Sequence, residues 1–410
     1  MRVLHLTTEF PPVIYGGLGT AVGGWVTASA RRGMTVAVLL VEGVLLVGDV
    51  GYGRYGQPAW AEHRAKDREQ VVINRNGVMF FQTSWFDAIE VGVRLVEQWQ
   101  PDIVHLHTAM LWHVAHSIQE RTSKRLVFHI HSVDHAEYEL GEEPNPWLAH
   151  NTAQDAAIEA ADHLIALSQS ERELLAHYYP TARDRIRVVG NGIDESPSAR
   201  QAARKERRTE SPIVFYCGRL VVRKGIHELL AAIPQVLERS PRTRLVLAGG
   251  PPLLTGDEVK QQWLPCDLNP YCSHVHFTGW LAPHQVAEWY RIADVLIVPS
   301  RYEPFGMVIL EGMLYGLPIA ASNVGGPAEI LEHGRTGLLF PPKNVEALTQ
   351  TLLQLVMDAG LRRQIGVAAA EEVRRKWLWP RIVEKMRAVY QEAINFRASD
   401  RQKNQLGRSG

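Results

Sequence analysis

The chain has 410 residues, and because one domain takes about 150 residues, this length suggests two or three domains. Its residues are 46% hydrophobic and 21% charged, a composition typical of a folded globular protein and not of a disordered or fibrous one. The 44 basic residues balance the 44 acidic ones, so no overall charge recruits nucleic acid or an anionic membrane.

Short β-branched or leucine-rich runs alternate with amphipathic stretches almost from end to end. This alternation predicts parallel sheets covered by helices, and therefore the α/β class. In the first half of the chain, strands are expected over residues 3–7, 35–41, 71–81, 103–107, 126–131, 163–166 and 186–189. In the second half they are expected over residues 213–217, 244–248, 274–277, 295–298, 318–321 and 337–339. The pattern restarts once, which indicates two large domains.

A polar segment without an apolar period separates the two halves. It begins shortly after Asn191-Gly192, a dipeptide typical of turns, so the domain boundary is expected there. The last residues of the chain are polar and are expected to be disordered. The predicted units are residues 1–194 (first domain), 195–211 (linker), 212–377 (second domain), about 378–398 (helix) and 399–410 (disordered tail).

The number of cysteines and the length of the apolar runs indicate the cellular compartment in which the protein is expected. Three cysteines are too few for a disulfide framework and lack metal-site spacing, which favours a reducing cytosol. Residues 1–9 lack the charged and apolar regions of a signal peptide. The most apolar run, residues 36–47, is far shorter than the ~20 residues of a membrane span. We therefore expect a cytoplasmic protein, and the sequence leaves open a peripheral contact with the inner face of a membrane.

Two glutamates flank the start of a helix that follows a central strand. The helix is expected over residues 307–315, and its free backbone N–H groups near Gly306 favour an anion at the carboxyl edge of the sheet. Glu311 lies roughly 7 Å along this helix, within reach of the ribose of a nucleotide whose diphosphate lies at the helix start. Glu303 lies on the opposite side of that diphosphate. The spacing therefore fits both ends of a nucleotide sugar.

Two basic residues, Arg219 and Lys224, follow the first strand of the second domain. Arg offers a planar fork of donors and Lys a compact charge, and both suit a diphosphate. Taken alone, the pair is equally consistent with a surface salt bridge. Because the strand before Glu303 ends at the same edge of the sheet, we favour the diphosphate.

A glycine-rich loop over residues 15–24 follows the opening strand and suggests a dinucleotide site, with Glu42 where an acid for the ribose is expected. The third glycine is missing, because Val22 takes its position. Pro11 and Pro12 also lengthen the loop before the helix. We therefore expect neither NAD nor another cofactor.

Two histidine pairs follow strands at the same edge of the first sheet. Alternation places His129 and His131 on one face, so a zinc site has to be considered. The nearby acids do not complete a familiar zinc spacing, and no metal site is expected. His105 and His107 are expected to be core residues or residues that support the site.

Residues 303–311, E-P-F-G-M-V-I-L-E, resemble the paired-glutamate motif of the retaining glycosyltransferases of family 4, the group of glycogen synthase and sucrose-phosphate synthase. Residues 216–225 are similar to that family's G-R-L-x-x-x-K-G segment, and residues 323–329 resemble its second glycine-rich turn. Asn191-Gly192-Ile193-Asp194 matches the close of its first domain. The resemblance covers nearly the whole chain. It implies the GT-B fold, in which two Rossmann-like domains with parallel sheets face each other across a cleft and a C-terminal helix, here about 378–398, crosses back to the first domain.

The resemblance also implies roles for individual residues. His131 would donate a hydrogen bond to a hydroxyl of the transferred sugar, and Glu303 would orient that sugar. The implied catalytic residues are His131, Glu303, Arg219 and Lys224. The implied donor-binding residues are Gly16, Gly17, Arg219, Lys224, Gly279, Leu281, Glu303, Phe305, Gly306, Met307, Val308 and Glu311.

The resemblance implies transfer of a hexose from a nucleotide-diphosphate sugar to a hydroxyl of a saccharide or glycolipid acceptor, with retention of configuration. Ile14 replaces the lysine of the family's K-x-G-G-L loop, which argues against ADP-glucose and makes UDP-glucose the favoured donor. No D-x-D pair occurs in the sequence, so we expect same-face attack without a metal ion anchored by such a pair. Two alternatives stay open: a nucleotide-sugar 2-epimerase on the same fold and a scaffold that only binds a nucleotide.

Overall fold

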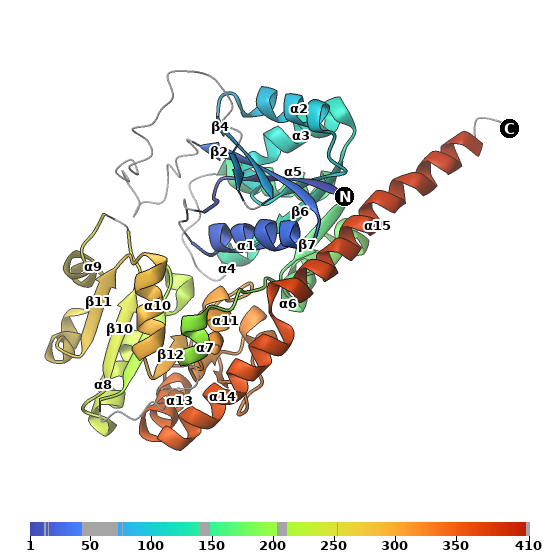
Figure 1. Ribbon diagram of the computed structural model, residues 1–410. Coiled ribbons are helices and arrows are strands. Elements are labelled where there is room, and N and C mark those ends of the chain that lie inside the picture. Colours follow the sequence, from blue (N-terminus) through green and yellow to red (C-terminus); the bar gives the residue numbers. More distant parts are fainter. Residues whose placement is uncertain are drawn as a thin grey trace.

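The computed structural model describes residues 1–11, 14, 16–42, 73–75, 77–139, 148–202, 211–251 and 253–406. Two separate sheets lie in the two halves of the molecule in Figure 1, each covered by helices. The strands of the first sheet are β1 (Arg2–Thr7), β2 (Thr35–Glu42), β3 (Ile73–Arg75), β4 (Val78–Ser84), β5 (Ile103–Leu106), β6 (Arg125–Ile130), β7 (His163–Ala166) and β8 (Ile186–Val188). Those of the second are β9 (Ile213–Cys217), β10 (Arg244–Ala248), β11 (Val275–Gly279), β12 (Val295–Val298), β13 (Ile319–Ser322) and β14 (Leu338–Phe340).

The helices alternate with these strands, as the sequence predicts for α/β domains. The helices of the first half are α1 (Gly17–Arg31), α2 (Ala88–Trp99), α3 (Trp112–Thr122), α4 (Asp134–Glu139), α5 (Leu148–Ala160) and α6 (Gln169–Tyr178). Those that follow are α7 (Pro197–Ala202), α8 (Ile226–Arg239), α9 (Gly256–Trp263), α10 (Pro283–Ile292), α11 (Met307–Leu314), α12 (Gly325–Ile330), α13 (Val345–Met357), α14 (Ala359–Lys376) and α15 (Trp379–Leu406).

The strand order is β3-β4-β2-β1-β5-β6-β7-β8 in the first sheet and β11-β10-β9-β12-β13-β14 in the second. All the strands pair in parallel except β3, which runs antiparallel to β4. The central strands are buried on both faces, and this is why their sequences are continuous apolar runs. The expected class, with two parallel-sheet α/β domains, is confirmed.

One expected strand is wrong. The sequence suggests a single strand over residues 71–81, but the structure forms the hairpin of β3 and β4 there, and residues 71–72 and 76 lie outside the described ranges. Gly77 makes the turn with a φ of 81°, a conformation that a residue with a Cβ rarely adopts. Two short apolar runs around one glycine have the period of one long strand, so the pattern alone does not separate them.

Helices cover both faces of each sheet. On one face of the first sheet, α2, α3 and α5 contribute to one hydrophobic core; on the other, α1 packs with α15, which arrives from the far end of the chain. In the second domain α8 and α13 cover one face, and α10, α11 and α14 cover the other. Within the described ranges, the helices include none that is long and apolar enough to cross a membrane.

The segment expected to be a linker contains a helix. In α7, the Ser196 hydroxyl accepts a hydrogen bond from the Ala199 backbone N–H, and Pro197 occupies the first turn, where its missing N–H is not needed. The side chains of Ala199 and Ala202 are buried. A helix of six residues is too short to give the sequence an apolar period. Residues 203–210 of this segment lie outside the described ranges.

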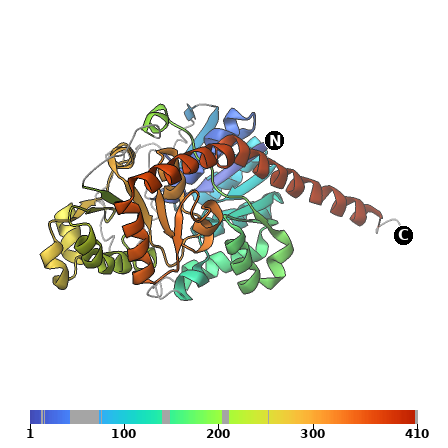
Figure 2. The same cartoon turned by 90° about the horizontal axis from the view of Figure 1, so that it is seen from below.

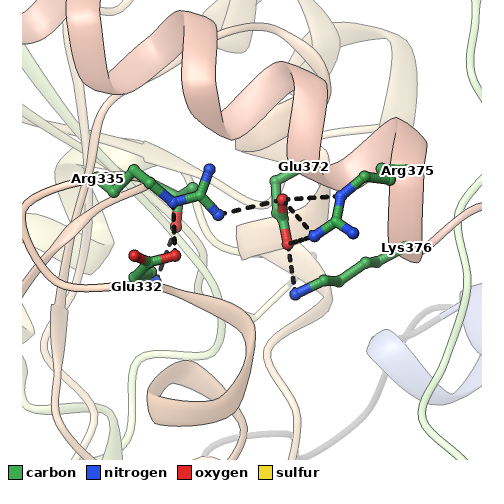
Figure 3. A network of polar contacts seen from close by, with 6 residues as sticks. Glu332, Arg335, Glu372, Arg375 and Lys376 are labelled. Carbon is green, nitrogen blue, oxygen red and sulfur yellow. Dashed lines mark hydrogen bonds and ion pairs between the residues drawn. The ribbon is translucent and has the colours of Figure 1, made fainter.

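A network of charged side chains holds α14 before the chain returns to the first domain (Figure 3). Burial alone would raise the pKa of Glu372, but hydrogen bonds from Lys376, Arg375 and Arg335 lower it to about 2. The Lys376 ammonium lies 2.5 Å from the carboxylate, and Arg335 reaches it from the loop after α12 at 3.2 Å. Glu372 therefore joins two segments of the second domain.

The C-terminal helix crosses back to the first domain, as expected. After α14 the chain pairs with it at Ile193 and Leu378, and α15 then runs along the first domain (Figures 1 and 2). The Trp379 and Trp25 rings pack with their centroids 5.1 Å apart. The helix continues to Leu406, into the segment that the sequence suggests to be disordered, and its far end projects beyond the rest of the fold (Figure 2).

Candidate active site

The structure contains the helix that the sequence predicts after Gly306, where an anion is expected to bind. Strand β12 is fully buried, and after a short loop α11 begins at Met307. Gly306 precedes it with a φ of 96°, and a Cβ at this residue would lie 3.0 Å from Ile309. Only glycine adopts this turn without strain. The first N–H groups of α11 consequently lie at the carboxyl edge of the second sheet, where the sequence predicts an anion.

The structure joins Glu303 and Lys224 directly. The Lys224 ammonium donates to the Glu303 carboxylate at 2.5 Å, and the Ser300 hydroxyl donates to the same oxygen at 3.2 Å. Both charged side chains are largely buried, with 15% and 11% exposed. Burial lowers the pKa of Lys224, and the Glu303 carboxylate opposes this shift. The sequence places each residue at this edge of the sheet but does not predict their ion pair.

Tight backbone contacts hold these two loops together. The Arg301 N–H donates to the Arg223 carbonyl oxygen at 2.7 Å. A Cβ at Gly225 would lie 1.9 Å from the Pro299 carbonyl oxygen, and one at Gly326 would lie 2.1 Å from that of Phe305. The loops after β9 and β12 and the start of α12 therefore form one rigid frame around the ion pair.

The second glutamate has a partner that sequence reasoning missed. The Tyr290 hydroxyl donates to the Glu311 carboxylate at 2.7 Å. Burial raises the pKa of Glu311, and the bond from Tyr290 opposes the shift. The Cys217 thiol lies nearby, and its burial together with the Glu311 charge raises its pKa to about 12. Sequence reasoning missed Tyr290 because it belongs to no recognised motif. It lies in α10, which precedes β12, the strand that leads to the paired glutamates.

The remaining residues expected in the second domain lie at the same edge of its sheet. Arg219 is exposed in the loop after β9, and its carbonyl oxygen accepts a bond of 2.7 Å from Tyr216. Gly279 ends β11 with a φ of 72°. Leu281, Met307 and Val308 are half-buried, whereas Phe305 is buried against Trp377.

The glycine-rich loop of the first domain faces this edge. A Cβ at Gly17 would lie 4.0 Å from the Met307 side chain, so the starts of α1 and α11 are neighbours. The Gly16 and Gly19 N–H groups each donate to the Glu9 carboxylate at 3.3 Å. Glu9 therefore already binds the start of α1, and the sequence did not single it out.

Contacts between the domains place His131 beside the Glu303 loop. Val133 donates its N–H to the Tyr302 hydroxyl at 3.0 Å, and these two residues lie close in sequence to His131 and Glu303. The Arg223 guanidinium lies 3.1 Å from the Glu137 carboxylate of α4. On another side, Glu329 accepts the N–H groups of Gln169 and Ser170 at the start of α6, at 2.9 and 2.8 Å. The structure thus brings most of the predicted residues together.

Five histidines form one cluster at the carboxyl edge of the first sheet: His5, His105, His107, His129 and His131. The His5 and His107 rings are joined by a bond of 2.9 Å between Nδ1 and Nε2, and His105 Nδ1 lies 2.6 Å from the Tyr390 hydroxyl. Burial lowers the pKa of His131 to about 3, so its ring is neutral at physiological pH. His105 and His107 are core residues, as expected, but His5 and Tyr390 were missed.

A buried carboxyl, Glu171 of α6, lies beside Tyr302 at the domain contact. Burial raises its pKa to about 8, and the Tyr302 hydroxyl opposes the shift. The folded chain therefore holds this proton more tightly than the unfolded chain, where the pKa is near 4.5. The stability that protonated Glu171 contributes is full below about pH 4.5 and falls as the pH rises to about 8.

Replacing Glu171 by Gln should therefore remove this decline. We expect Glu171→Gln to be more stable than the parent protein at about pH 8, by on the order of 3 kcal/mol, with the difference vanishing toward about pH 4.5. Denaturant unfolding at a series of pH values measures it. Glu173→Gln, an exposed position of the same helix, is the control and should show no such trend. A constant difference between Glu171→Gln and the parent at every pH would contradict the assignment.

Comparison with known families agrees with this geometry. Residues 15–196 match the family model described as Glycosyltransferase Family 4, and residues 198–372 match Glycosyl transferases group 1. A glycogen synthase of Mycobacterium tuberculosis is 26% identical over 95% of this chain and 94% of its own length. A D-inositol 3-phosphate glycosyltransferase of Kribbella flavida is 30% identical over 73% of each chain.

Solved structures share the fold. Sucrose-phosphate synthase from Thermosynechococcus elongatus superposes with a TM-score of 0.73 at 22% identity, over 96% of this chain and 98% of that one. HepE from Anabaena, solved in complex with UDP and glucose, gives a TM-score of 0.69 at 20% identity, over 95% and 99% of the two chains. With both domains matched, the chain is a glycosyltransferase that belongs to family 4 and has the GT-B fold.

Proposed function

We propose that the protein transfers a hexose, most favourably glucose, from UDP-glucose to a hydroxyl of a saccharide or glycolipid acceptor, with retention of configuration. The observation that carries this proposal is the buried pair of Lys224 and Glu303 beside the start of α11, with Glu311 one turn further along the helix. A cation, a carboxylate and free N–H groups at one sheet edge suit a diphosphate flanked by a sugar and a ribose.

In the proposed reaction the acceptor oxygen attacks the anomeric carbon on the face from which the diphosphate leaves. The bond from this carbon to the diphosphate oxygen breaks, and that oxygen takes the acceptor proton. Lys224, Arg219 and the N–H groups at the start of α11 stabilise the charge that develops on the diphosphate. Glu303 orients the sugar, and the neutral His131 ring donates a hydrogen bond to one of its hydroxyls. The proposal uses no metal ion and no cofactor.

Three features support the donor. HepE, which shares the fold, was solved with UDP-glucose and with UDP and glucose. Ile14 offers no cation where bacterial glycogen synthases carry lysine, which disfavours ADP-glucose. The Glu311 carboxylate, fixed by Tyr290, is an acceptor suited to the paired hydroxyls of a ribose. A glycolipid acceptor would bring the protein to a membrane surface, a contact that stays a prediction.

A panel of nucleotide sugars tests the donor by thermal denaturation. A ligand that binds only the folded chain stabilises it by about 2.7 kcal/mol at one hundred times its Kd, so UDP-glucose should raise the midpoint more than ADP-glucose or GDP-mannose. Glu311→Gln retains an acceptor for Tyr290 but loses the charge, and it should lose most of this shift. Stronger stabilisation by ADP-glucose would overturn the donor assignment.

Product analysis separates the proposal from its two alternatives. Incubation with UDP-glucose alone should give at most slow hydrolysis, and transfer should need an added acceptor. A 2-epimer formed without acceptor would identify an isomerase. A donor that binds and is neither hydrolysed nor transferred with any acceptor would identify a scaffold.

A further inference from the structure

The histidine cluster of the first domain has more buried nitrogens than its own bonds satisfy. Its members come from three neighbouring strands, β1, β5 and β6, and alternate residues of one strand face the same side. Among the described residues, buried ring nitrogens without a hydrogen-bond partner include Nε2 of His5, Nε2 of His105 and both nitrogens of His129. Buried polar atoms without partners are rare, so those of His129 call for an explanation.

We propose that His107, His129 and His131 bind one divalent transition-metal ion, for which Zn²⁺ is the best match. Their ligand nitrogens all lie within 4.8 Å of one another. His107 Nδ1 and His131 Nε2 are 3.4 Å apart, which is long for a hydrogen bond. It is close to the separation of roughly 3.3 Å between two nitrogens that share a tetrahedral Zn²⁺ with bonds of about 2.0 Å.

His129 supplies the third ligand. Its ring stacks beside that of His131, with the centroids 4.4 Å apart and the planes 18° from parallel, because the two residues are alternate positions of one strand end. His129 is fully buried, and neither of its ring nitrogens has a hydrogen-bond partner among the residues that the structure describes. It can therefore turn one nitrogen toward the ion without breaking an existing interaction.

His5 fixes the tautomer of His107 that can bind a metal ion through Nδ1. When His107 Nε2 carries the proton, it donates to His5 Nδ1 at 2.9 Å and leaves the lone pair of its Nδ1 directed at His131. A partner that orients a ligating imidazole in this way is the usual support of a metal site. Imidazole ligands suit Zn²⁺, and three of them leave a fourth position open.

His131 determines both the route by which a metal ion can enter the site and the effect of the bound ion on sugar transfer. It is half-buried, whereas His107 and His129 are buried, so an ion enters from the side of the sugar-binding region. A metal on His131 Nε2 occupies the ring that we assign to a sugar hydroxyl. Zn²⁺ should therefore inhibit transfer by competing with the donor. The inhibition rests on the proposed function, whereas the binding of the ion does not.

Metal titration of the full chain, without a histidine tag and freed of metal by a chelator, tests the binding. Co²⁺ should give the visible absorption of a tetrahedral complex, and Zn²⁺ should displace it and compete with a chromophoric chelator in stoichiometric amount. His129→Leu, which has a similar volume, and His107→Asn should each weaken Zn²⁺ binding by at least about tenfold. His284→Asn, at an exposed position of α10, should leave the affinity unchanged. Absence of binding, or equal affinities in all four proteins, would overturn the site.

A second measurement addresses inhibition. In assays with UDP-glucose and an acceptor, Zn²⁺ should inhibit transfer by the parent protein, and this inhibition should weaken as the UDP-glucose concentration is raised. His129→Leu should keep its basal rate and be at least about tenfold less sensitive to Zn²⁺. Equal sensitivity of the two proteins would refute inhibition through this site. If the protein binds Zn²⁺ but transfers no sugar, the proposed function is refuted and the metal site is retained.

Discussion

Glu303→Gln is expected to lower the turnover number by about 10²–10³, the usual cost of losing one preorganised electrostatic contact at a reaction centre. The substitution keeps the shape of the side chain and removes the charge that pairs with Lys224 at 2.5 Å. Lys224→Met, which removes the other charge, should have an effect of the same order. Steady-state rates with saturating donor and acceptor measure both.

The double variant separates catalysis from stability. Breaking a buried ion pair at one partner leaves an uncompensated charge and destabilises the fold, whereas removing both partners is often neutral. Glu303→Gln combined with Lys224→Met should therefore unfold close to the parent protein and remain as inactive as either single variant. Asp162→Asn, which breaks the similarly buried pair with Arg125 at the opposite end of β6, should cost stability and leave turnover intact. Wild-type turnover in either single variant would refute the assignment.

The sequence predicted the sheet edge at which the site lies but not the contacts within it. Apolar period and helix signals located β12, α11 and the two glutamates, because these follow from local chemistry. The bond between Lys224 and Glu303 joins residues 79 positions apart. It depends on β9 and β12 being neighbours in the sheet, and strand order has no local signal.

The absence of a local signal for strand order also explains why the sequence predicted only part of the histidine cluster. Alternation along β6 placed His129 and His131 together, and a zinc site was considered and not favoured on the spacing in the sequence. The supporting contacts come from His107 and His5, on strands that the topology brings alongside. Glu171 was missed for a related reason: it lies in the first turn of α6, where an acid is favoured by the helix dipole, and its burial beside Tyr302 of the second domain has no local signal in the sequence.

Trp379→Ala is expected to lower the free energy of unfolding of the first domain by about 3–5 kcal/mol, the range for removing a large buried aromatic side chain. The Trp379 side chain is only 3% exposed, and its ring packs on Trp25 where α15 meets α1. Denaturant unfolding followed by the fluorescence of the remaining tryptophans measures the change. Trp280→Ala, the same substitution at a side chain that is 42% exposed, should change the stability far less.

Gly24 supplies the sharper test of this contact, because the tryptophan ring occupies the place of its missing side chain. A Cβ at Gly24 would lie 2.3 Å from the Trp379 ring, so Gly24→Ala forces α1 and α15 apart and should cost about 1–3 kcal/mol. In the Trp379→Ala background the obstacle is gone, and the same substitution should become neutral or stabilising, since alanine favours a helix over glycine by up to about 1 kcal/mol. Additive effects of the two substitutions would mean that α15 does not dock through this ring. A coupling of the expected sign would establish that the Trp379 ring of the returning helix docks directly against Gly24 of α1.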